Sequence, residues 1–174
     1  MTDLREQFRH TIIETTEITC ETLAFMFPML PPEDGPEPGE QEHSELIRVR
    51  VYFEGLVDGA LLLSMPGAML PALAANMLGL DEAATTPEQR ADAARELCNV
   101  VCGNLLPAVA GPEPVFSVSP PELCDDIPAP DSATCVSART WLDEGWVEAE
   151  FSVTGGLDRL SSRDGGAGGL RLIA

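Results

Sequence analysis

The chain has 174 residues, of which 44% are apolar, and a formal net charge of −19 at pH 7. This length and apolar content fit one domain built around one core. Nucleic acid and anionic membranes do not attract so acidic a body, so we expect neither as a general partner.

One uncharged stretch, residues 59–80, is long enough to cross a bilayer, which leaves a transmembrane segment as an alternative. Pro66 and Gly67 interrupt it, which favours a strand, a turn and a helix instead. The acidic N-terminal residues do not fit a secretory signal. We therefore expect a cytoplasmic protein without membrane insertion.

The first expected element is a helix from Asp3 to about Phe27, which has helical apolar periodicity and is stopped by Pro28. Residues 31–44 follow and are rich in Pro, Gly and acidic side chains. Such a segment cannot bury a core, so we expect a mobile acidic loop.

A hairpin and a helix are expected next. Residues 46–54 alternate between apolar and polar side chains, and residues 61–64 are apolar enough for a buried second strand. Asp58 and Gly59 supply turn residues between them. Residues 67–78 are expected to be helical.

Another helix is expected to begin at Pro87 and to end near Pro107. Thr86 before it and Gln89 in its first turn form a capping-box pattern, in which each side chain caps the other residue's backbone N–H.

Three further strands are expected at residues 115–118, 135–142 and 146–153, with a turn at 143–145 joining the last two. The order predicts an α+β fold, a mainly antiparallel sheet with about three helices packed on one face. We expect one domain over residues 1–154 and a disordered Gly-rich tail over 155–174.

The five cysteines are expected to be free thiols, because they are odd in number and no export signal precedes them. Cys98 and Cys102 have a spacing that permits a metal or redox role. Both lie toward the apolar side of their helix, and only His10 and His43 could add imidazole ligands, which favours buried structural thiols.

The helix expected from Pro87 has a polar stripe. At about 100° per residue, Asp92, Glu96, Asn99 and Gly103 fall on one face, and the apolar residues Ala94, Leu97, Val101 and Leu105 fall on the opposite face. Asn and Gly are poor helix formers, so their presence on this face lowers the stability of the helix. This cost favours a surface that a partner approaches closely. Solvent-facing polar residues of an ordinary amphipathic helix are the alternative.

The stripe resembles the signature of the CheX/CheC/FliY chemotaxis phosphatases, which is Asp or Ser, three residues, Glu, two residues, Asn, and a Pro further on. Asp92, Glu96 and Asn99 match it, and Pro120–Pro121 stand about one residue before the expected Pro. Residues 54–66 resemble the glycine-containing hairpin that precedes the first inter-motif helix of CheX-like proteins, and the segment ending at Leu80 resembles the end of that helix. The resemblance covers about residues 45–153.

The resemblance implies that the chain hydrolyses the phospho-aspartate of a CheY-like response regulator receiver domain. Asn99 would orient the attacking water and Glu96 would bind the receiver's lysine. Asp92 would orient Glu96 or contact the partner, and Gly103 would let the partner's backbone approach. The resemblance implies no cofactor of the chain's own, with Mg²⁺ carried by the receiver.

The segment Glu14–Glu17 has no Asn, so the chain resembles one-site, CheX-like proteins, which implies a homodimer. Two other hypotheses remain. One is a non-catalytic receiver-binding adaptor or flagellar-switch module of the same fold, and the other is a metal or redox protein built on Cys98 and Cys102.

Overall fold

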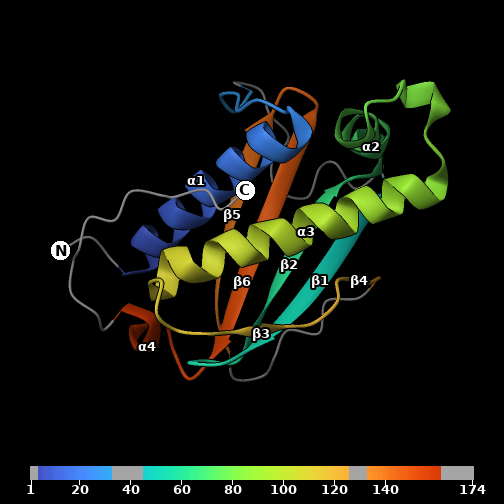
Figure 1. Ribbon diagram of the computed structural model, residues 1–174. Helices are drawn as coiled ribbons and strands as arrows, with labels where there is room; N and C mark the ends of the chain where they lie inside the picture. Colours follow the sequence, from blue (N-terminus) through green and yellow to red (C-terminus); the bar gives the residue numbers. More distant parts are fainter. Residues whose placement is uncertain (1–3, 33–44, 126–132, 162–174) are drawn as a thin grey trace.

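The computed structural model describes residues 4–32, 45–125 and 133–161 (Figure 1). Its centre is an antiparallel sheet in the order β3-β1-β2-β6-β5, with β4 also paired to β1. The strands are β1 (Leu46–Glu54), β2 (Gly59–Pro66), β3 (Ser117–Val118), β4 (Glu122–Leu123), β5 (Ala133–Leu142) and β6 (Gly145–Thr154).

Two long helices, α1 (Leu4–Ala24) and α3 (Pro87–Ala110), lie side by side on one face of this sheet (Figure 1). The shorter α2 (Leu70–Leu78) packs against α3, and α4 (Asp158–Ser161) follows the last strand. Single 3₁₀ turns, Gly67–Met69 and Glu82–Ala84, precede α2 and α3. The predicted α+β class with helices on one face is confirmed.

The alternation of β1 explains why the sheet has one core face. Val49, Val51 and Phe53 are buried toward the helices, whereas Arg48, Arg50 and Tyr52 lie on the other face. The inner residues of β2 and β6 continue this layer, and the rings of Phe53 and Phe151 stack 5.2 Å apart. Burial of this layer against the helices provides most of the stability of the fold.

The start of α3 is fixed by the capping box that the sequence predicts. The Thr86 hydroxyl accepts from the Gln89 backbone N–H at 3.2 Å, and the Gln89 side-chain oxygen accepts from the Thr86 N–H at 2.9 Å. Asn104 donates to the Thr19 hydroxyl at 3.1 Å and so links α3 to α1. The stripe of α3 therefore sits on a helix with a defined start and register.

Two helix ends differ from the sequence prediction. Helix α1 ends at Ala24 because Phe25 takes a left-handed φ of +52°, after which the Met29 N–H donates to the Trp141 carbonyl at the sheet edge. Helix α3 continues past Pro107 to Ala110. A proline in the last turn loses only one hydrogen bond, and burial of Leu106 and Ala110 offsets that loss.

The later strands also differ in detail. Only Ser117–Val118 of the strand expected at 115–118 is paired, and β4 was not predicted, since both strands are two residues long and depend on pairing with β1. The expected disorder from Gly155 is wrong for residues 155–161, because Leu157 and Leu160 are buried in the core. Residues 33–44 and 162–174, where the acidic loop and the rest of the tail were expected, lie outside the described residues.

The uncharged stretch at residues 59–80 folds as a strand, a 3₁₀ turn and a helix, which overturns the transmembrane alternative for that stretch. Within the described ranges, no helix has the length and apolar character needed to cross a membrane.

Candidate functional site

Helix α3 brings the four predicted stripe residues together on its solvent-facing side. Asp92, Glu96, Asn99 and Gly103 are all exposed. The opposite side of the helix packs on the sheet through fully buried apolar side chains, which include Leu97, Val101 and Leu105. The predicted division of α3 into a core face and a polar face is therefore present in the structure.

The two carboxylates of the stripe differ in their partners. Asp92 accepts a hydrogen bond from Arg95, with 2.6 Å between Oδ1 and Nη1, so its charge is offset within the helix. Among the described residues, Glu96 and Asn99 have no hydrogen-bonding or charged partner. Their carboxylate and carboxamide are thus left available to another molecule. Sequence reasoning missed Arg95, although its i,i+3 spacing from Asp92 was a usable signal.

Gly103 leaves a bare patch of backbone at the end of the stripe. Apart from its two chain neighbours and its own helix backbone, no heavy atom of the described residues lies within 4 Å of the position that a Cβ on Gly103 would take, so packing against these residues does not require a glycine. Pro107 has no N–H to donate to the Gly103 carbonyl, which would otherwise be its helical acceptor. A partner could therefore approach this backbone closely.

The β3–β4 segment lies along one side of α3. The Cys98 thiol donates to the Val49 carbonyl of β1 at 3.5 Å, and Val49 is paired with Leu123 of β4. These contacts place β4 beside the helical turn that bears Asn99. Pro120 and Pro121, which approximate the family's proline, fall between β3 and β4.

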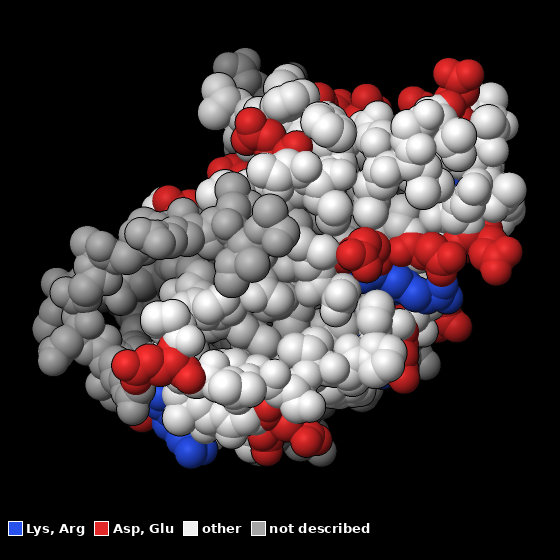
Figure 2. Space-filling view, in the orientation of Figure 1, with Lys and Arg blue, Asp and Glu red and all other residues white. Residues whose placement is uncertain are grey.

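Figure 2 shows this face of the molecule. Acidic side chains gather over the first half of α3 next to a basic group, and a mostly uncharged surface lies below them. The charged residues of that half of the helix include Glu88, Asp92 and Glu96 with Arg95. The site is therefore predominantly acidic, in a chain that is already acidic as a whole.

The two cysteines of α3 lie in the core, which favours a structural role. Cys98 and Cys102 are fully buried. Burial raises the pKa of Cys102 to about 12, and burial followed by the neighbouring Cys102 raises the pKa of Cys98 well above its ordinary value. Within the described ranges, no group of three or more metal-ligating side chains is assembled. Protonated, buried thiols are poor ligands and poor nucleophiles, which argues against the metal or redox hypothesis.

Thiol titration checks this interpretation. Burial and the charge of Glu17 also raise the pKa of Cys20 to about 12, so we expect Cys20, Cys98 and Cys102 to stay unreactive toward an aromatic disulfide in the native protein at pH 8. All five cysteines should react after denaturation. Rapid labelling of native Cys98 or Cys102, or bound zinc in stoichiometric amount, would instead support the metal or redox hypothesis.

The same thiols predict an alkaline loss of stability. An unfolded thiol loses its proton near the ordinary pKa of 9.0, whereas buried Cys20 keeps its proton up to about 12. The unfolded state therefore binds fewer protons between these pH values, so the free energy of unfolding should fall as the pH rises from 9 to 12. Urea unfolding at pH 8 and pH 10, with Cys20→Ala as a variant whose slope is smaller, measures this effect.

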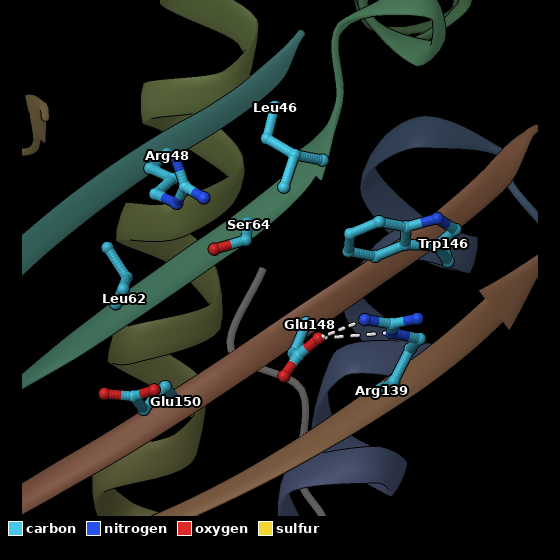
Figure 3. A pocket seen from close by; sticks show the side chains of 8 residues that line it. All are labelled: Leu46, Arg48, Leu62, Ser64, Arg139, Trp146, Glu148 and Glu150. Atoms are coloured by element: carbon cyan, nitrogen blue, oxygen red, sulfur yellow. Dashed lines mark hydrogen bonds and ion pairs between the residues drawn. The ribbon is translucent and has the colours of Figure 1, made fainter. Parts of the chain in front are cut away.

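A separate hollow of about 180 Å³ lies on the opposite face of the sheet (Figure 3). Small-molecule sites usually have volumes of roughly 300–1,000 Å³. The Arg139 guanidinium forms an ion pair with the Glu148 carboxylate at 2.6 Å and lies 4.1 Å from the centroid of the Trp146 ring. Its charge is therefore balanced within the chain. The lining residues are Leu46, Arg48, Leu62, Ser64, Arg139, Trp146, Glu148 and Glu150. This hollow contains none of the stripe residues.

Residues 47–136 match the family described as chemotaxis phosphatase CheX, which is just over half of the chain. The chain belongs to the CheX family. No curated protein sequence gives a significant match.

Solved structures agree on the fold. CheX from Desulfovibrio desulfuricans is 15% identical with a TM-score of 0.65, covering 84% of this chain and 99% of that chain. A CheX-CheY-BeF3-Mg²⁺ complex from Borrelia burgdorferi is 14% identical with a TM-score of 0.61, and the match covers 83% of this chain and 96% of that chain. FliY from Thermotoga maritima is 15% identical with a TM-score of 0.56, and the match covers 89% of this chain and 91% of that chain. At such identities the likeness shows the fold alone.

Proposed function

We propose that this protein is a phosphatase that hydrolyses the phospho-aspartate of a CheY-like receiver domain. The observation that supports it best is the pair Glu96 and Asn99, exposed one turn apart on a firmly packed helix and without partners among the described residues. A carboxylate and a carboxamide held on a rigid element form a small pre-organised site. Membership of the CheX family and the solved CheX-CheY complex support the same reaction and partner.

Asn99 is proposed to orient the attacking water. Its carboxamide has two N–H donors and a carbonyl acceptor, so it can accept from a water molecule and donate to a phosphoryl oxygen at the same time. Phosphoryl transfer needs an attacking oxygen in line with the leaving group, and positioning that oxygen supplies much of the catalysis. The leaving group is the receiver's aspartate, and the products are free carboxylate and inorganic phosphate.

Glu96 is proposed to dock the helix on the receiver's lysine by a charge-assisted hydrogen bond. Because Arg95 already offsets Asp92, Glu96 is the stripe carboxylate that remains free for an intermolecular cation. Asp92 then acts by holding Arg95 in place or by contacting the partner at the edge of the interface. Mg²⁺ would be held by the receiver, where it would stabilise charge on the phosphoryl oxygens.

The test is phosphate release from a panel of phosphorylated receiver domains, with and without this protein. Faster release from at least one receiver supports the phosphatase. Binding to a phosphorylated receiver without faster release would support the adaptor alternative instead. That alternative, which includes a flagellar-switch role, is favoured by one observation, the shared fold with FliY and with the FliM middle domain.

A homodimer is also proposed, on the basis of the resemblance. The β5 edge of the sheet offers only part of its length for pairing with a second copy, because Arg9 donates to the Ser137 carbonyl and Met29 donates to the Trp141 carbonyl. Sedimentation equilibrium over a range of protein concentrations would show whether the chain is a dimer. We place its action in the cytoplasm, in chemotaxis or a related two-component pathway.

Gly103 is expected to lower the stability of α3 and to let the receiver's backbone approach the helix. Because no described residue outside its own turn lies close to the added Cβ, Gly103→Ala should raise the free energy of unfolding by about 1 kcal/mol through better helix propensity. The added methyl group should weaken receiver binding several-fold if the partner's backbone approaches here. Urea unfolding and a receiver titration measure the two effects, and unchanged affinity would remove Gly103 from the interface.

A further inference from the structure

The β3–β4 segment presents exposed apolar side chains beside the stripe. Val118 is 37% exposed and Leu123 is 43% exposed, and Val115, just before β3, is 88% exposed. Both short strands are held by pairing with β1. The two apolar side chains are therefore held in place on strands that also expose Ser117 and Glu122, and we call this pair, Val118 and Leu123, the β3–β4 shelf.

The Leu123 end of the shelf lies next to the candidate site. The Cys98–Val49 hydrogen bond and the Val49–Leu123 pairing connect Leu123 to the α3 turn in which Asn99 directly follows Cys98. Figure 2 shows a mostly uncharged surface adjoining the acidic group over α3. A body seated on Asn99 would therefore also cover this neighbouring surface.

Size and charge both favour such an extended contact. A standard protein interface covers about 800 Å² on each partner, which is more than one stripe of a helix provides. The phosphoryl group of the partner carries roughly two negative charges, which a chain with a net charge of −19 repels at long range. Short-range apolar contact would therefore add affinity beyond that of the proposed Glu96–lysine pair.

We propose that the β3–β4 shelf is the apolar docking surface for the same phosphorylated receiver domain whose acyl phosphate faces Asn99. This inference rests on the proposed function and adds the residues that supply affinity and partner choice. Val118 and Leu123 would contact apolar side chains that flank the receiver's phosphorylation site, while Glu96 and Asn99 enter that site.

The test uses Val118→Ser and Leu123→Ser, singly and together, with the receiver that responds best in the panel. We expect the double variant to raise KM, and the dissociation constant of the beryllofluoride-loaded receiver, by about tenfold with kcat unchanged. Leu30→Ser is the matched control, since Leu30 is 89% exposed and follows Met29, which is bonded at the opposite, β5 edge of the sheet. Thermal unfolding verifies that every variant is folded.

The outcomes separate this inference from the proposed function. If wild-type protein accelerates release and Asn99→Ala does not, but the shelf variants keep KM and affinity, the phosphatase stands and the shelf is wrong. If the shelf variants lower kcat with KM unchanged, docking is also the wrong role. If no receiver either binds or releases phosphate faster, the proposed function fails and the shelf fails with it.

Discussion

Replacing Asn99 with alanine is expected to lower kcat for receiver dephosphorylation by roughly 100-fold, because the attacking water loses the group that orients it. Receiver affinity should stay nearly unchanged, since Glu96 and the neighbouring surface remain. Asn99 is exposed and without a partner among the described residues, and alanine is the better helix former, so the variant should be at least as stable as the wild type. Single-turnover phosphate release at saturating protein measures the effect.

Two further variants sharpen this prediction. Asn99→Asp keeps the size of the side chain but removes the N–H donors and adds a charge next to the phosphoryl group, so it should be at least as inactive as Asn99→Ala. Gln7→Ala removes an exposed carboxamide from α1 and should leave kcat at the wild-type value. Retention of more than about half of the wild-type kcat in Asn99→Ala would contradict the water-orienting role.

Local signals account for the parts of the fold that the sequence predicted well. The alternation of β1 fixed its bounds at Leu46–Glu54, and the Thr86–Gln89 capping box fixed the start of α3. Both signals depend on residues within a few positions of each other, so no tertiary information was needed.

Long-range contacts account for the errors. Residues 27–29 leave α1 to bond with the end of β5, which lies over 100 residues later in the chain. The two-residue strand β4 exists through its pairing with β1, and the end of the chain folds back so that Leu157 and Leu160 reach the core. Propensity over a short window cannot detect such partners.

In the candidate site, too, local spacing predicted some features, and others depended on the three-dimensional structure. Spacing on a helix predicted that Asp92, Glu96, Asn99 and Gly103 share a face, and the structure has them there. The i,i+3 spacing of Asp92 and Arg95 permitted an ion pair but did not decide that it forms and leaves Glu96 without a charged partner among the described residues, because side-chain pairing on a helix also depends on rotamer choice. The contact of α3 with the β1–β4 edge required the tertiary fold.

Replacing Glu96 with glutamine should weaken receiver binding by at least about tenfold, because close charge pairs across an interface contribute more than 1 kcal/mol. Glutamine keeps the size and hydrogen-bonding capacity of the side chain, so the loss measures the charge. The change should appear in KM and in the dissociation constant of the beryllofluoride-loaded receiver, with kcat at saturation reduced much less. Glu88→Gln, which removes an equal exposed charge from the first turn of α3, is the matched control.

A charge exchange identifies the partner of Glu96. Glu96→Lys should abolish binding to the wild-type receiver and regain part of it when the receiver's lysine is replaced by glutamate, since only a direct pair is restored by the double change. If Glu88→Gln weakens binding as much as Glu96→Gln, the effect comes from net charge and the docking role is wrong. Because Asn99 lies one turn from Glu96 on the same helix, a confirmed Glu96–lysine pair would set where the Asn99 carboxamide meets the acyl phosphate.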